Sequence, residues 1–173
     1  VQPGNQTTGA LAIYNRTNTK ILYGTGLSSW NLVPMNTGTG CIPYTAQNMD
    51  QSYTLDDRGV YGMTTTQAYG NFVASSLTEA IQPFIAQHRS KAVCSVLCRE
   101  KSQYRVYFSD GTGLHVTIVN GKYFGAMPVF YPINSDSVPA GLYNAWSGTA
   151  TNGDEVILGC GTDGYVYQLD KGT

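Results

Sequence analysis

Three polar corners spaced 53 residues apart constrain the fold of this chain more than any other feature. Each corner pairs an aspartate with a glycine that follows it within two positions, and both intervals between the aspartates are equal (110 − 57 and 163 − 110). The corner residues are Asp57 with Gly59, Asp110 with Gly111, and Asp163 with Gly164. Aspartate caps its own turn and glycine tolerates a positive φ, so this pairing is typical of a bend between two strands.

Runs of β-forming residues flank each corner, as in YRVYF (104–108) and LHVTIV (114–119). We expect Tyr104, Tyr107, Phe108 and Tyr165 to pack beside the corners. A repeat of about 40–50 residues built from short strands is typical of a propeller blade. The sequence therefore predicts an all-β fold, a partial β-propeller of about three to four blades of antiparallel strands. A β-sandwich with regular hairpins is the alternative, and the first hairpin (10–26) lies off the period.

One segment, residues 75–90, breaks the strand pattern and predicts a short helical insertion. Ser76 and Glu79 have the spacing of a capping box, and Leu77 and Ile81 follow at helical spacing. Pro83 should end or kink this helix. The rest of residues 1–173 is expected to form a single β-rich domain.

The composition excludes several classes of protein. Only 12% of the 173 residues are charged and the net charge is −1, so no basic stripe is available to bind nucleic acid without regard to sequence. No apolar run is long enough to span a bilayer as a helix. The four cysteines, at 41, 94, 98 and 160, lack the spacing of zinc or redox motifs, so we expect free and largely buried thiols with no metal and no cofactor.

No recognisable catalytic motif occurs in the chain. A nucleophile elbow, a zinc-binding H-E-x-x-H helix and a phosphate-binding loop are all missing from the sequence. We expect His88 to lie at the surface after the helix and His115 to occupy an ordinary sheet position. The sequence thus predicts a protein that is not an enzyme. Trp30 and Trp146 are the aromatic residues best suited to contact a ligand such as a glycan.

Three stretches together resemble β-propeller segments of tailed-bacteriophage tail proteins, of the kind found in the nozzle and hub of short-tailed phages. They are YTLDDRGVYGMTTTQAYGNF (53–72), SQYRVYFSDGTGLHVTIV (102–119) and EVILGCGTDGYVYQLDKGT (155–173). In that family a short helical QPF segment precedes an NQYRxxFxDGTG-like hairpin. The matching positions here are Gln82 to Phe84, Gln103 to Arg105, Phe108 and Asp110 to Gly113.

The resemblance implies a structural role in the virion, with no catalytic residues, in a wall through which the genome is ejected. The implied partners are copies of the chain and other tail proteins, with DNA only as passing cargo, in a virion assembled in the host cytoplasm. Because members of the family are several times longer, we expect this chain to be a fragment. Two alternatives stay open. One is a glycan- or receptor-binding module, and the other is a glycoside hydrolase fragment with two carboxylates roughly 5–10 Å apart.

Overall fold

The computed structural model describes residues 10–35, 38–65, 72–130 and 141–171, and it confirms the all-β class. The chain divides into two compact units, residues 1–87 and 88–173. Each unit is described by itself. Four small antiparallel sheets hold nearly all of the regular structure, and none of them closes on itself within the described ranges.

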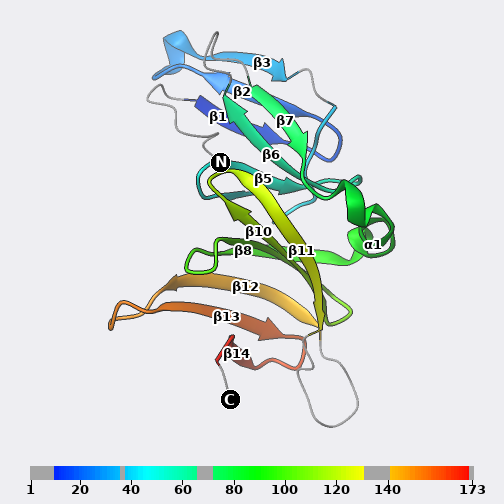
Figure 1. Ribbon diagram of the computed structural model, residues 1–173. Coiled ribbons are helices and arrows are strands. Elements are labelled where there is room, and N and C mark those ends of the chain that lie inside the picture. The colour runs from blue at the N-terminus through cyan, green and yellow to red at the C-terminus, as the bar shows by residue number, and fades with distance from the viewer. Residues whose placement is uncertain (1–9, 36–37, 66–71, 131–140, 172–173) are drawn as a thin grey trace. The chain divides into compact units, whose positions relative to one another are not determined.

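Two sheets belong to the N-terminal unit, and both run up and down in chain order (Figure 1). The first consists of β1 (Ala10–Tyr14), β2 (Thr19–Tyr23) and β3 (Asn31–Met35), with a 3-10 turn, η1 (Leu27–Ser29), before β3. The second consists of β4 (Gln47–Asn48), β5 (Ser52–Leu55), β6 (Val60–Thr65) and β7 (Phe72–Ser76). A small core joins them, since Ala12 and Ile21 of the first sheet cluster with Met63 of the second.

The expected helical insertion is present and is shorter than residues 75–90. Ser76 is the last residue of β7, and helical turns begin only with η2 (Glu79–Ile81) and continue through α1 (Gln82–His88) and η3 (Arg89–Lys91). The helical segment is divided just before Pro83, since η2 ends at Ile81 and α1 begins at Gln82, and Pro83 does not end α1. Pro83 is the second residue of α1, where the missing N–H costs nothing because first-turn donors have no partner within the helix.

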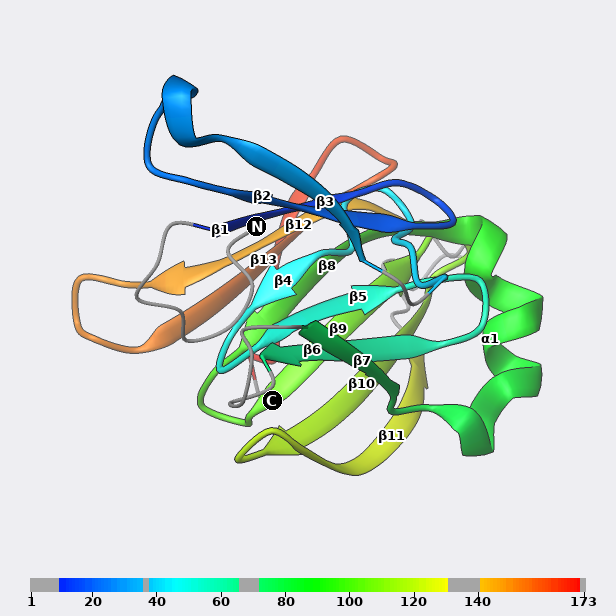
Figure 2. The same ribbon diagram turned by 90° about the horizontal axis from the view of Figure 1, so that it is seen from above.

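The C-terminal unit also holds two meander sheets (Figure 2). One consists of β8 (Ala92–Cys98), β9 (Gln103–Phe108), β10 (Thr112–Val119) and β11 (Lys122–Phe130). The other consists of β12 (Leu142–Thr149), β13 (Glu155–Gly161) and β14 (Val166–Leu169). Their facing sides form one core, in which Cys94, Val96 and Tyr107 meet Leu142 and Ile157.

The three corners occupy the same place in three successive sheets. They join β5 to β6, β9 to β10 and β13 to β14, which are the second and third strands of their sheets. The first hairpin does not follow the 53-residue period, because its strands correspond to strands that come later within the next sheet. Strand β2 lies 53 residues before β7 (72 − 19), the fourth strand of the next sheet. Among the three sheets that carry a corner, the sequence period is therefore a period of whole sheets.

Of the four aromatic residues expected to pack beside the corners, three are buried and one is not. Tyr104, Tyr107 and Phe108 are fully buried on β9. Tyr165 is 69% exposed, because it lies in the turn before β14 and not on a strand face. Its ring contacts that of Tyr167 within the same hairpin, at a centroid distance of 6.5 Å.

Candidate functional site

The corner at Asp110 is the most polar of the three. One carboxylate oxygen, Oδ1, accepts hydrogen bonds from the Thr112 backbone N–H at 3.1 Å and from the Thr112 hydroxyl at 2.6 Å. The other, Oδ2, lies 2.9 Å from Lys91 Nζ and 3.1 Å from His88 Nδ1. Partial burial raises the pKa of Asp110, but the bonds from Thr112 and Lys91 outweigh it and hold the pKa well below its usual range. The carboxylate thus stays ionised and fastens its own turn.

His88, Asp110 and Thr112 resemble a catalytic triad in composition but not in geometry. A triad histidine contacts its carboxylate through one ring nitrogen and its nucleophile through the other. Here the Thr112 hydroxyl lies 3.3 Å from Nδ1, the same nitrogen that faces Asp110. His88 is also buried, contrary to the expected surface position, because its ring packs beside that of Phe108, with 5.5 Å between the ring centroids. Because Thr112 and Asp110 both meet the same ring nitrogen, the arrangement orients a turn.

The corner at Asp163 repeats this plan at the surface. Oδ1 of Asp163 accepts a bond from the Tyr165 backbone N–H at 3.1 Å, and the Tyr167 hydroxyl donates to Oδ2. Gly164 has φ +88° and donates its N–H to the Gly161 carbonyl at 3.1 Å. Both turns therefore use an aspartate that caps the residue two positions later and a left-handed glycine.

In the first corner the capping aspartate is Asp56, one residue before the position predicted by the period. Oδ1 of Asp56 accepts bonds from the backbone N–H groups of Arg58 and Gly59, at 2.7 and 3.1 Å. The Asp57 carboxylate instead accepts hydrogen bonds from Nη2 and Nε of Arg16, at 2.6 and 3.1 Å. Only one of two adjacent carboxylates can lie over the β5–β6 turn. Asp56 therefore caps that turn, and Asp57 reaches Arg16 in the β1–β2 turn.

Replacing Gly164 by valine should destabilise the protein by about 1 kcal/mol or more, because a side chain at a left-handed φ is strained even in open space. Gly26→Val is the matched control, since Gly26 is also in open space but has an extended φ of −166°. That change should alter stability by less than about 0.5 kcal/mol. Chemical denaturation of both variants measures the difference. Equal losses would show that the left-handed corner contributes nothing.

A charged cluster that the sequence did not reveal lies inside the C-terminal unit. Arg105 projects from the middle of β9, and its side chain is only 1% exposed. Its Nη2 lies 2.6 Å from Asp170 Oδ2, just after β14, and Lys101 Nζ reaches the same oxygen at 2.8 Å. Gln103 Oε1 accepts from Arg105 Nε and Nη2 at 3.0 and 2.8 Å. We call these four residues the Arg105 cluster, and it ties the end of β14 to β9.

His115 is paired with Arg105 across β9 and β10 and is 8% exposed. The sheet position agrees with the sequence, but the surroundings are not ordinary. Burial, followed by the positive charge of Arg105, lowers the pKa of His115 to about 4. Burial raises the pKa of Asp170, yet the bonds from Arg105 and Lys101 more than offset it. At neutral pH the cluster thus holds a neutral imidazole beside an ion pair.

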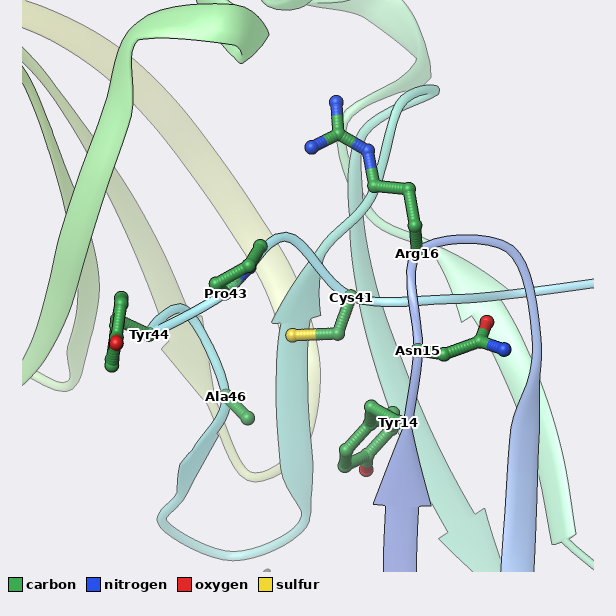
Figure 3. Close-up of a pocket in the computed structure, with 7 residues that line it drawn as sticks. All are labelled: Tyr14, Asn15, Arg16, Cys41, Pro43, Tyr44 and Ala46. Atoms are coloured by element: carbon green, nitrogen blue, oxygen red, sulfur yellow. The ribbon is translucent and has the colours of Figure 1, made fainter.

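A pocket of about 500 Å³ opens in the N-terminal unit (Figure 3). Tyr44 and Tyr14 lie on opposite sides of it, and the sulfur of Cys41 points between them. Tyr44 has φ +64°, an uncommon conformation for a bulky residue, and is 83% exposed. The volume is within the range of small-molecule sites, roughly 300–1,000 Å³.

Two reactive groups of this pocket, the Cys41 thiol and the Arg16 guanidinium, are already engaged. The Cys41 thiol donates to the Ile42 carbonyl at 3.0 Å, and burial raises its pKa, so it is a protonated thiol at neutral pH. Arg16 is held by Asp57. The pocket therefore offers aromatic and apolar walls and a cation whose charge is already neutralised.

The two tryptophans proposed as ligand contacts are both exposed, Trp30 at 54% and Trp146 at 56%. Trp30 follows η1 in the connection to β3, whereas Trp146 lies on β12. They belong to different units of the chain. All four cysteines are free thiols, and three are buried, as the sequence predicts.

Two features are missing from the described part of the chain. No three side chains among its histidines, cysteines, aspartates and glutamates gather around a common point that could hold a metal ion. Its helices include none with the length and apolar character required to cross a bilayer.

Comparison with known proteins yields no relative. No family model, curated protein or solved structure matches the chain.

Proposed function

We propose that this chain is a structural component of a bacteriophage tail, in its nozzle or hub, and that its sheets are blades of a β-propeller. Two features support the proposal. Successive meander sheets repeat with capped corners at the same strand junction, which is the organisation of propeller blades. The QPF helix and the DGTG hairpin occur in the order found in the family that the sequence resembles. The chain acts in the virion wall by packing, with copies of itself and other tail proteins as partners.

The observation that carries this proposal is a sheet with one face in the core and a row of leucines on the other face, beside a single lysine, Lys20. One face of β1–β2–β3 packs in the core of the N-terminal unit through Ala12 and Ile21. On the other face, Leu11, Leu22 and Leu32 stand opposite one another and form a continuous row across the three strands. Leu11 is 43% exposed and Leu32 is 49% exposed.

A sheet that is mostly apolar on both faces is typical of an inner layer, covered on both sides. Exposed apolar patches of this kind mark sites of protein association. The leucine row is therefore the surface through which the chain packs into a larger assembly. The chemistry of the row, aliphatic side chains standing up from a pleated sheet, suits another β-sheet as its cover.

The proposal is tested on particles from a tailed phage whose genome encodes this chain. The wild-type chain should co-sediment with intact particles and give a band on an immunoblot. The double variant Leu11→Lys, Leu32→Lys should be lost from the particles, because two lysines across the row would be buried without partners. Leu27→Lys is the matched control, since Leu27 is 84% exposed and lies outside the row.

Each result decides one part of the proposal. A wild-type chain that never co-sediments with particles would contradict the role in the virion. A double variant that is incorporated as well as the Leu27→Lys control would contradict packing through the leucine row.

A further inference from the structure

Trp146 lies on the outer face of the β12–β13–β14 sheet. Ala145 and Ile157 pack into the core of the C-terminal unit, so their neighbours Trp146 and Leu158 point to the opposite side. A Cβ added to Gly148 would overlap Cη2 and Cζ2 of the Trp146 indole, so the ring covers this glycine. The backbone at Gly148 thus supports one side of the indole, and Trp146 remains 56% exposed.

The side chains around this ring are neutral. Strand alternation and register place eight residues on the same face: Asn144, Trp146, Gly148, Val156, Leu158, Cys160, Val166 and Gln168. None of these eight carries a charge. Asn144 and Gln168 are exposed amides. Asn144 Oδ1 accepts a hydrogen bond from the Ala145 backbone N–H at 2.8 Å, so its NH2 group is the part that can donate to a ligand, whereas the Gln168 amide has both donor and acceptor atoms.

We propose that this outer face binds a neutral oligosaccharide, with one sugar ring stacked on Trp146. The C–H groups on one face of a pyranose carry partial positive charge, and they are attracted to the negative face of an aromatic ring. The amides of Asn144 and Gln168 supply the few polar groups that orient a ligand on a largely apolar site. Because the face carries no charge, it offers no partner for a charged glycan, and a neutral glycan suits it better.

The contrast with the leucine row distinguishes a glycan from a protein partner. In the row, branched side chains stand up from the sheet and can interlock with those of a second sheet. The β12–β13–β14 face also carries branched side chains, Val156, Leu158 and Val166, but its largest side chain is an exposed indole that covers a glycine and has two amides on the same face. The two faces therefore have separate roles, and glycan binding does not depend on the tail role proposed above.

The chain provides its own fluorescent reporter for a test. It contains two tryptophans, so Trp30→Phe leaves Trp146 as the sole indole. This protein is titrated with maltoheptaose, cellohexaose and chitohexaose while its emission is recorded. At least one of the three should produce a saturable shift, because the sugar ring replaces water over the indole. Isothermal titration of the wild-type chain with the same sugar should give a similar dissociation constant.

Three variants locate the site. Trp146→Ala should weaken binding by about tenfold or more. Gly148→Val should weaken it as well, since the new side chain displaces the ring while keeping the tryptophan. Gln168→Ala, at an exposed position, should weaken binding with little risk to folding. Far-UV circular dichroism and thermal melts check that each variant is folded. Phe124→Ala serves as the matched control that retains binding, since Phe124 is an aromatic residue on β11, 81% exposed and outside this face.

Three results would overturn the inference. The first is no saturable shift with any of the three sugars. The second is binding that persists in a folded Trp146→Ala variant. The third is self-association of the wild-type chain that shields Trp146 and is lost in Trp146→Ala, which would show that a second copy covers this face.

Discussion

Replacing Asp170 by alanine should lower the free energy of unfolding by about 3 kcal/mol, since it removes the carboxylate that faces a buried cation. The Arg105 side chain is 1% exposed, and its Nη1 is buried without a hydrogen bond. In the variant Arg105 keeps the side-chain oxygen of Gln103 but loses the carboxylate that balances its charge. Urea denaturation of the wild type and the variant measures the loss.

Lys101→Ala is the matched control, because Lys101 contacts the same oxygen of Asp170 from a side chain that is 54% exposed. Exposed pairs contribute about 0–1 kcal/mol, so this variant should stay close to the wild type. The double variant Arg105→Met, Asp170→Asn should recover much of the loss, because it leaves no buried charge behind and asparagine tolerates the left-handed φ of +61° at this position. If Asp170→Ala costs no more than Lys101→Ala, the buried pair does not hold β14 to β9.

The second large effect is a loss of stability between pH 7 and pH 4 that depends on His115. Its pKa is lowered from 6.5 to about 4 in the folded chain, so the unfolded chain takes up a proton first as the pH falls. Stability is therefore complete above pH 6.5 and decreases as the pH falls toward 4. A difference of one in pKa between the folded and unfolded chain corresponds to about 1.4 kcal/mol, which gives a total loss of about 3 kcal/mol.

His115→Gln should flatten this slope, since glutamine has a similar polarity and does not titrate. The measurement is the free energy of unfolding by urea at half-unit steps from pH 7 to pH 4, for the wild type and the variant. The carboxylates with lowered pKa values, Asp110, Glu155, Asp163 and Asp170, lose their contribution mainly below the ordinary carboxyl range and so affect both proteins alike. If the free energy of unfolding falls equally steeply with pH in the wild type and in His115→Gln, that result would contradict a neutral, buried His115.

The corners could be predicted from the sequence because their cause is local. An aspartate caps the residue two positions later and a glycine accepts a left-handed φ, so the spacing of Asp110 and Asp163 marks two real turns. The same reasoning could not choose between Asp56 and Asp57, because the choice depends on Arg16, which lies some forty residues earlier. The class of the fold follows from local signals as well.

The Arg105 cluster depends on long-range contacts and could be predicted only in part. Arg105 lies inside YRVYF, among residues that belong in a core. A charged residue in such a segment indicates a buried charge in need of a partner. Nothing in the order of residues identifies Asp170 as that partner, since 65 positions separate the two (170 − 105). The burial of His88 could not be predicted for the same reason, because Phe108 and Asp110 reach it from a different hairpin.

The position of this chain on a particle decides whether it has the proposed role in the virion. Immunogold labelling of purified tailed particles, with antibody raised against residues 1–173, is the measurement, and Leu11→Lys, Leu32→Lys particles serve as the comparison. We expect gold at one end of the tail in the wild type and little or none in the double variant. Unlabelled wild-type particles, with the chain found only in the soluble fraction of the lysate, would contradict the proposed role.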